Sequence, residues 1–124
     1  MKLAHPDRPV VALSGDGSAM YSIQALWTAA HHDLAVVFVI LNNREYRILK
    51  HNMDTYRQRF GAKPDRGYPN MDLVSPDLGF VEIARGLGVE GLRVSKPGEL
   101  RPALEKALGA GRPFLLDVAI EGRA

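Results

Sequence analysis

The sequence predicts an α/β domain in which a mostly parallel sheet lies between helices on both faces. Apolar runs of strand length alternate along the chain with segments of helical periodicity. The run from Ala35 to Leu41 is apolar throughout and does not alternate, which is typical of a strand covered on both faces. The chain has 124 residues, the size of one domain. We therefore expect a single three-layer domain over residues 1–124, with right-handed crossovers between its strands.

The first part of the chain predicts a strand, a helix and a second strand. Residues 10–13 form a short apolar run closed by the turn of residues 14–17, as expected of a buried strand. Residues 23–30 carry apolar side chains at helical spacing, and Ser18 or Ser22 is available as the N-cap of one helix. The seven-residue apolar run is the second strand.

The middle of the chain predicts a short helix and a long loop. The helical segment runs near residues 46–52. Residues 53–74 are polar, show little periodicity and contain Pro64, Gly67 and Pro69, so we interpret them as a loop. Loops of this length are uncommon in compact domains and are usually functional or mobile.

The last part predicts a helix, a strand, a helix and a final strand. Residues 75–77 offer a helix start, and the helix ends at the glycines of 86–88. Residues 89–94 form a third strand, 100–108 form the most regular helical stripe, and 114–120 form the last strand. The predicted order is βαβα, loop, αβαβ, without an internal repeat or a linker between domains.

Composition excludes several kinds of site and location. The chain has no cysteine, which excludes disulfides, thiolate metal sites and cysteine nucleophiles. No run reaches the roughly 18 consecutive apolar residues of a membrane span, and the N-terminus lacks the apolar segment of a signal peptide. We therefore expect a cytoplasmic protein that does not enter a membrane.

Positive charge is concentrated between Arg44 and Arg66. The net charge of the chain is +2, but this stretch holds seven basic residues against three acidic ones. We interpret it as a solvated basic loop, and an anion-binding surface stays open as the alternative. No basic motif interleaved with aromatic residues is present, so we do not expect binding of nucleic acid.

Two polar groups follow two successive predicted strands. Asp16 lies in the Gly15-Asp16-Gly17-Ser18 turn, and Asn43 follows the next strand 27 positions later. Parallel strands joined by one crossover bring their carboxyl ends to the same ligand crevice. A carboxylate and a carboxamide there suit a hard cation such as Mg²⁺. The alternative is structural, because Asp-Gly is a common turn and asparagine often satisfies loop backbone.

The same turn favours a ligand that carries a diphosphate. Gly15 and Gly17 let a ligand approach the backbone, and the amides of Gly17 and Ser18 point outward at the start of a helix. Asp16 alone would repel phosphate. A divalent cation between the two removes that conflict, because the metal is then the largest local charge.

These residues resemble the thiamine-diphosphate-binding motif of thiamine-dependent enzymes. The resemblance is carried by Gly15 to Ser18, by the Tyr21-Ser22-Ile23-Gln24-Ala25-Leu26-Trp27-Thr28-Ala29-Ala30 segment and by the Val37 to Asn43 run. It extends more loosely through the final helix and strand. Within the family, the chain is most similar to the C-terminal diphosphate-binding domain of the benzoylformate decarboxylase and acetolactate synthase branch.

The resemblance implies a set of site residues. The Mg²⁺ ligands would be Asp16, Asn43 and the backbone carbonyl of Glu45, and Asn42 would support the turn. The residues that bind the cofactor would be Gly15, Asp16, Gly17, Ser18, Tyr21, Asn43, Glu45 and Tyr46, the last through its amide. Ile48 and Leu49 would lie near the substrate pocket. Arg44 and Arg47 stand where close family members often carry glycine, which leaves the substrate open.

The resemblance also implies a function and a partner. The chain would bind thiamine diphosphate and Mg²⁺ as a module of a 2-oxo acid lyase or carboligase. The glutamate that activates the cofactor belongs to a pyrimidine-binding domain or subunit, so we expect no catalytic residue in this chain and no activity from it alone. We expect a homo-oligomer, and a domain truncated at its N-terminus. The alternative is a non-catalytic remnant or assembly module that retains the fold.

Overall fold

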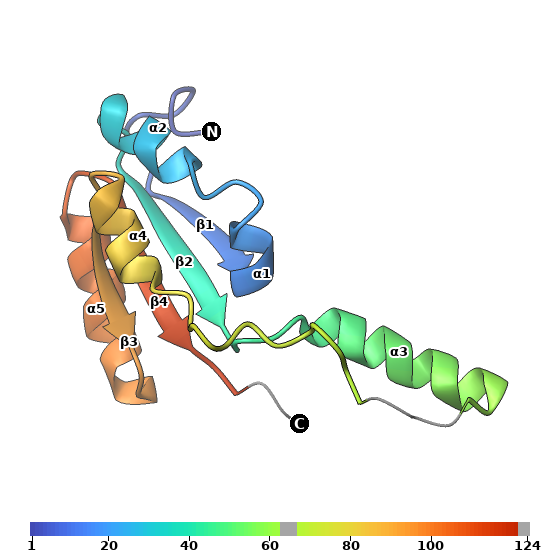
Figure 1. Cartoon of the computed structure of the whole chain (residues 1–124). Coiled ribbons are helices and arrows are strands. Elements are labelled where there is room, and N and C mark those ends of the chain that lie inside the picture. Colours follow the sequence, from blue (N-terminus) through green and yellow to red (C-terminus); the bar gives the residue numbers. More distant parts are fainter. Residues whose placement is uncertain (63–66, 122–124) are drawn as a thin grey trace.

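A four-stranded parallel sheet forms the centre of the molecule. A computed structural model describes residues 1–62 and 67–121 (Figure 1). The strand order is β1-β2-β4-β3, and all three pairings are parallel. The strands are β1 (Val10–Gly15), β2 (Val36–Asn42), β3 (Glu90–Val94) and β4 (Phe114–Ala119). The predicted α/β class with a parallel sheet is confirmed.

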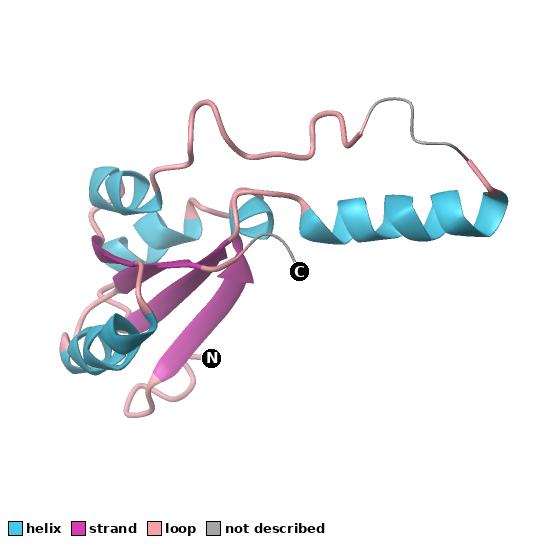
Figure 2. Cartoon of the chain, turned by 90° about the horizontal axis from the view of Figure 1, so that it is seen from below, coloured by secondary structure: helices cyan, strands magenta, loops and turns pink. Residues whose placement is uncertain are grey.

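Helices cover both faces of this sheet, as predicted. The helices are α1 (Asp16–Ala19), α2 (Ala25–His31), α3 (Arg47–Phe60), α4 (Phe80–Gly86) and α5 (Pro97–Gly109). Helix α5 lies on one face, and α1, α2 and α4 lie on the other (Figure 2). Helix α3 belongs to neither layer and extends away from the sheet (Figure 1).

Each face of the sheet has its own apolar core. Val37 and Val39 of β2 pack with Ala103 and Ala107 of α5. Ile40, on the opposite face of β2, packs with residues of α1, α2 and α4. The first five residues of β4 are buried, which fits its central position between β2 and β3. Strands covered on both faces read as continuous apolar runs, and this is why β2 and β4 were predictable.

The first strand is less buried than its composition predicts. Val11 and Leu13 are 49% and 66% exposed, so the expectation of a buried strand over 10–13 is wrong on this face. Strand β1 lies at the edge of the sheet, and α5 packs over the other three strands. Apolar side chains on the α5 side of β1 therefore remain exposed.

The segment after β1 forms two short helices in place of the predicted single one. Neither Ser18 nor Ser22 is an N-cap, because α1 begins after Gly15 and α2 begins after Gln24 without a side-chain cap. Tight turns join the two helices: the Tyr21 amide donates to the Ser18 carbonyl, and the amide of Ala25 donates to that of Ser22. The chain thus bends where a continuous helix was expected.

Helix α3 corrects the predicted loop over 53–74. The helix continues to Phe60 and ends at Gly61, which has φ 61°, a conformation that favours glycine. Leu49, Met53, Tyr56 and Phe60 lie at helical spacing and form an apolar stripe that the predicted loop overlooked, although none of the residues of α3 is buried. Residues 63–66 of the predicted loop lie outside the described ranges.

Residues 67–74, called the returning segment below, are hydrogen-bonded to α3 at Asp54 and Arg57. The Tyr68 hydroxyl donates to the Asp54 carboxylate at 2.7 Å, and Arg57 donates to the Gly67 carbonyl.

No helix in residues 1–62 and 67–121 is long and apolar enough to cross a membrane. Helix α4 begins at Phe80, a few residues later than predicted, whereas β3, α5 and β4 lie where the sequence placed them.

Candidate functional site

The turns that follow β1 and β2 lie side by side. The two strands pair in parallel with Gly15 opposite Leu41, so their carboxyl ends coincide. The backbone amide of Arg44 donates to Asp16 Oδ2 at 2.6 Å, which ties the second turn to the first. The structure therefore brings Asp16 next to the turn that carries Asn43 and Glu45.

Asp16 is a buried carboxylate with fixed orientation. It is 4% exposed, and its second oxygen, Oδ1, accepts the Gly17 amide at 2.8 Å. Burial of a charged carboxylate is costly unless hydrogen bonds compensate, and these two backbone donors supply them. A carboxylate offers about four acceptor positions, so Asp16 retains oxygen lone pairs for a cation. The Gly17 amide, by contrast, is occupied by Asp16 in this structure.

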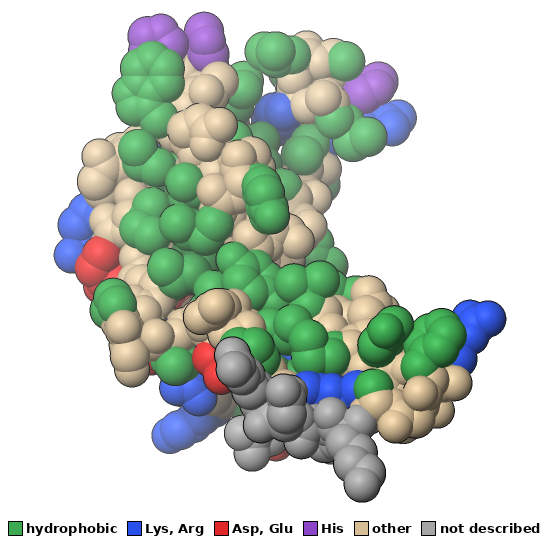
Figure 3. Space-filling view, turned by 45° about the vertical axis from the view of Figure 1, so that its right-hand side comes forward, with side chains coloured by type: hydrophobic (Ala, Val, Ile, Leu, Met, Phe, Trp, Pro, Cys, Tyr) green, Lys and Arg blue, Asp and Glu red, His purple; other side chains and the backbone are tan. Residues whose placement is uncertain are grey.

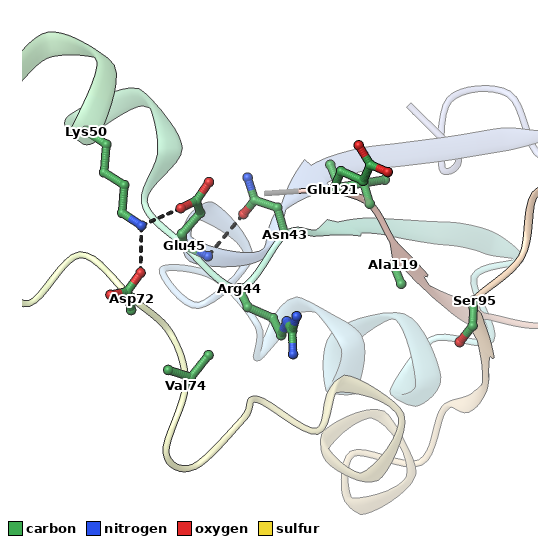
Figure 4. A pocket seen from close by; sticks show the side chains of 10 residues that line it. Asn43, Arg44, Glu45, Lys50, Asp72, Val74, Ser95, Ala119 and Glu121 are labelled. Carbon is green, nitrogen blue, oxygen red and sulfur yellow. Dashed lines mark hydrogen bonds and ion pairs between the residues drawn. The ribbon is translucent and has the colours of Figure 1, made fainter. Parts of the chain in front are cut away.

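The turn after β2 is held by its own side chains. Asn43 Oδ1 accepts the amide of Glu45 at 3.1 Å. The Glu45 residue is 7% exposed, and its carboxylate pairs with Lys50 (Figure 4). The same carboxylate lies 3.4 Å from Arg47. Because basic side chains hold this carboxylate, Glu45 offers a ligand its backbone carbonyl more readily than its side chain.

Lys50 joins the turn to the segment that returns from α3. Its ammonium pairs with Glu45 and, at 2.6 Å, with Asp72 (Figure 4). The hydrogen bonds to Asp72 and Glu45 raise the pKa of Lys50 above its ordinary value. The side chains of Lys50 and Glu45 are 13% and 7% exposed, so their ion pair is shielded from solvent, whereas Asp72 is 59% exposed. Lys50 was not among the predicted site residues.

The returning segment pairs with the turn through its backbone. Glu45 and Asp72 form an antiparallel bridge, and the amide of Tyr46 donates to the Met71 carbonyl at 2.8 Å. The resemblance assigns that same Tyr46 amide to a diphosphate. In this structure the amide is engaged by Met71, so contact with a diphosphate would require a local shift of the returning segment.

The Tyr46 ring occupies the space beside Gly17, so this position has no room for a side chain. A β-carbon at residue 17 would lie 2.4 Å from Cε1 and 2.7 Å from Cδ1 of the Tyr46 ring. Real β-carbons do not make contacts that short, so only glycine leaves room for the ring. The motif glycine thus fits the Tyr46 side chain into the first turn.

An open cavity lies at the carboxyl ends of the central strands. Its volume is 760 Å³, and it is lined by Asn43, Arg44, Glu45, Lys50, Asp72, Val74, Ser95, Ala119, Ile120 and Glu121 (Figure 4). Two of the proposed metal ligands border it, whereas Asp16 lies behind the turn. Arg44, which lines the cavity, has φ 60°, a left-handed conformation that favours glycine.

Three of the predicted residues lie on the surface, outside the lining of this cavity. Tyr21, Ile48 and Leu49 are 86%, 65% and 46% exposed. Met20 and Trp27 are also exposed apolar side chains. Apolar side chains gather over the α1–α2 side of the molecule (Figure 3). Ser18 is exposed as well, so its hydroxyl is accessible from the same side.

Sequence reasoning missed a buried polar network behind the turn. Asp117 of β4 is 1% exposed; it accepts Asn42 Nδ2 at 2.9 Å and Arg93 Nη1 at 2.7 Å. Asn42 Oδ1 in turn accepts the Arg44 amide at 3.2 Å, which is the supporting role expected of Asn42. The signal in the sequence was an acidic residue within the apolar run of the last strand.

Comparisons with known proteins agree on one domain type. The profile of the family described as "Thiamine pyrophosphate enzyme, C-terminal TPP binding domain" matches residues 1–118. A putative acetolactate synthase large subunit of Mycobacterium tuberculosis is 43% identical over 95% of this chain and 23% of its own length. Benzoylformate decarboxylase of Pseudomonas aeruginosa is 43% identical over 94% of this chain and 20% of its own.

Solved structures give the same result for the fold. The thiamine diphosphate-dependent 4-hydroxybenzoylformate decarboxylase of Rhodococcus jostii superposes with a TM-score of 0.84 at 38% identity, over 97% of this chain and 21% of that one. The chain therefore spans about a fifth of the length of the relatives that it matches.

Proposed function

The chain belongs to the thiamine pyrophosphate enzyme family as a C-terminal TPP-binding domain, and on this premise we propose that it holds the diphosphate of that cofactor through Mg²⁺ at the ends of β1 and β2. The observation that carries the proposal is the buried Asp16 carboxylate, which is tied by hydrogen bond to the turn of Asn43 and Glu45. Decarboxylases and acetolactate synthases are among its relatives.

The oxygen atoms at this edge suit Mg²⁺. Asp16 offers a carboxylate, Asn43 a carboxamide oxygen and Glu45 a backbone carbonyl, which are all hard ligands. Mg²⁺ prefers six oxygens and commonly completes its shell with phosphate and water. The three protein groups would hold the metal, and the diphosphate would supply further oxygens.

The first turn would receive the diphosphate itself. The amide and the exposed hydroxyl of Ser18 are donors on this turn, next to the cation that Asp16 would hold. The Gly17 amide would become a further donor if Asp16 turned its Oδ1 from this amide to the cation. The Tyr46 amide would become one if the returning segment, whose Met71 carbonyl it now bonds, moved away. When bound, thiamine diphosphate supplies the carbanion chemistry for decarboxylation of a 2-oxo acid, and the protein orients it.

The proposed partner is a pyrimidine-binding domain or subunit. Met20, Tyr21 and Trp27 are exposed apolar side chains that follow the first turn in the sequence. Apolar side chains gather on the α1–α2 side of the molecule (Figure 3), and exposed apolar surface of this kind binds other proteins. Relatives about five times longer contain further sequence that can provide such a domain. We therefore propose that catalysis on a 2-oxo acid, to an aldehyde or a carboligation product, requires this partner, within a homo-oligomer.

Calorimetric titration of thiamine diphosphate into the chain tests the cofactor site. We expect binding that requires Mg²⁺ and that Asp16→Ala abolishes. Asp7→Ala removes an exposed carboxylate at the far end of β1 and should leave binding unchanged. Binding that ignores Mg²⁺ or survives Asp16→Ala would contradict the metal assignment, and no binding by the parent chain would refute the proposed function.

A further inference from the structure

An ion pair between a buried carboxylate and a half-exposed guanidinium lies behind the turn that would carry the metal ligands. Asp117 of β4 and Arg93 of β3 are direct partners in the strand register, and Arg93 Nη1 donates to Asp117 Oδ2 at 2.7 Å. Asp117 is 1% exposed, whereas the Arg93 side chain is 47% exposed. A buried carboxylate of this kind requires paired charge and hydrogen bonds on both oxygens. Asn42, on the neighbouring strand β2, supplies the bond to the other oxygen.

Asp117 fixes the orientation of the Asn42 carboxamide. An ionised carboxylate only accepts hydrogen bonds, so the NH₂ end of Asn42 must face it. The carboxamide oxygen is then directed to the other side, where it accepts the Arg44 amide at 3.2 Å. Without the charge on Asp117, either end of the carboxamide could face β4, and the acceptor for Arg44 would no longer be specified.

The Arg44 amide is the point where this network meets the proposed metal site. It is shared between Asn42 Oδ1 and Asp16 Oδ2, the latter at 2.6 Å. Arg44 also holds a left-handed φ of 60°, which a residue with a side chain adopts only when its surroundings enforce it. The two hydrogen bonds of the Arg44 amide hold the backbone in this conformation, because both would be lost if the peptide rotated.

We propose that Asp117, paired with Arg93, is a positioning residue for the metal-binding turn. Asp117 orients the Asn42 carboxamide, which holds the Arg44 peptide against Asp16. The position of that peptide in turn fixes where the neighbouring Asn43 and Glu45 place their oxygen atoms. This inference rests on the proposed function, since it assigns a purpose to that turn. Asp117 itself does not contact the metal or the cofactor. Groups that orient metal ligands typically alter metal affinity about 10- to 100-fold when they are removed.

The test compares Asp117→Asn with a matched variant of the same strand. Val118→Ala removes buried volume from the opposite face of β4, which packs against α5, and leaves the network intact. Hydrogen exchange of the Arg44 amide, followed by NMR in the cofactor-free chain, reports the turn directly. The amide of Val39 in β2 serves as the reference for general loss of stability. In Asp117→Asn, we expect the exchange rate of the Arg44 amide to rise about tenfold or more beyond the rise at Val39. Val118→Ala should change both amides equally.

Cofactor titration provides the second measurement. Asp117→Asn should weaken Mg²⁺-dependent binding of thiamine diphosphate about 10- to 100-fold, and Val118→Ala should not. The double variant Asn42→Asp with Asp117→Asn exchanges the two side chains. The carboxylate at residue 42 can accept the Arg44 amide and also the NH₂ group of the carboxamide at residue 117. The double variant should therefore restore both the slow exchange of the Arg44 amide and the cofactor affinity. Asn42→Ala, which removes the carboxamide and leaves Asp117 paired with Arg93, is the second variant for use if Asp117→Asn does not fold, and its Arg44 exchange should also accelerate.

The two proposals fail in different ways. If the parent chain does not bind the cofactor, the proposed function is refuted and exchange at Arg44 alone decides the positioning role. In Asp117→Asn, the exchange rate of the Arg44 amide could rise by no more than that of the Val39 amide. Cofactor affinity could also stay unchanged while the chain loses stability. Either result would show that Asp117 is a structural core residue and that the positioning role is wrong.

Discussion

The ring of Tyr46 fills the space that a side chain at residue 17 would need. A β-carbon built on Gly17 lies 2.4 Å from Cε1 of this ring. Gly17 and Tyr46 come from the two turns that flank the proposed site, so their contact packs one turn against the other. The glycine of the motif therefore has a structural role before any ligand is considered.

Gly17→Ala should destabilise the chain by about 1–3 kcal/mol, the usual cost of forcing a group into packed space. Urea unfolding measures the loss. In a Tyr46→Ala background the cost should largely disappear, because the ring is then absent. Gly15→Ala is the matched control: no atom lies within 4 Å of its β-carbon position, and its φ of −76° suits any residue. Equal losses at residues 15 and 17 would rule out the steric explanation.

Arg44→Gly should be more stable than Arg44→Ala. Both variants lose the 3.8 Å ion pair with Asp77, but only glycine relieves the left-handed backbone. That relief is worth about 1–2 kcal/mol, offset in part by the entropy of glycine, about 0.5–1 kcal/mol. We expect a net difference of about 0.5–1 kcal/mol in urea unfolding.

The corresponding pair at Arg47 provides the control for this experiment. Arg47 is the first residue of helix α3, where alanine is favoured over glycine, so the order of the two variants should reverse. A preference for alanine at both positions would mean that the strain at Arg44 is not relieved by glycine.

The start of α5 should give a pH-dependent contribution to stability. The amides of Ser95 and then Lys96 donate to Glu99 Oε2 at 3.0 and 3.1 Å, and they lower the pKa of Glu99 below its ordinary 4.5. A lowered folded-state pKa stabilises the protein above the unfolded value, and the contribution is lost as the pH falls through the folded value.

Glu99→Gln should therefore be less stable than the parent at pH 7, and the difference should shrink as the pH falls below 4.5. Urea midpoints across that range provide the measurement. Glu105→Gln removes an exposed carboxylate of the same helix that pairs with Arg101, and its effect should be smaller at pH 7. A difference for Glu99→Gln that stays constant with pH would contradict the proposed ionisation effect.

Lys50→Met should release the segment that returns from α3. The substitution leaves Glu45, which is 7% exposed, with only Arg47 among the basic partners seen in the structure, at a cost of about 1–3 kcal/mol. The Tyr46 amide, bonded to Met71, should then exchange faster with solvent. Lys50→Arg keeps the charge and should largely retain protection. Unchanged exchange in Lys50→Met would show that backbone pairing alone holds the segment.

The parts of the fold that pack against the sheet were predictable. Strands β2 and β4 are covered on both faces, so burial and composition agree in them. The length of helix α3 was underestimated, because the polar residues around Leu49, Met53, Tyr56 and Phe60 favoured a loop although these four lie at helical spacing. In β1, an apolar composition showed what the strand can bury, but not that α5 would pack over other strands.

Prediction of the site had a similar limit. Asp16 and Asn43 follow successive strands, so their proximity required only that β1 and β2 be neighbours. Asp117 was missed because its contact with Asn42 depends on β4 being inserted between β2 and β3, and the order of strands is not written in local periodicity. Its partner lies 75 positions away in the sequence.

That separation also has a consequence for the order in which the molecule is assembled. During synthesis the turn with Asn42 leaves the ribosome long before β4, although β4 is a central strand of the sheet. Early pairing of β1 with β2 leaves the inner edge of β2 open until the last strand arrives, and closing so long a loop is slow. The inner edge of β2 therefore stays unpaired while the residues between β2 and β4 are made. The turn that contains Asn42 is therefore made before the strand whose Asp117 it contacts, and its hydrogen bonds are completed only when that strand is in place.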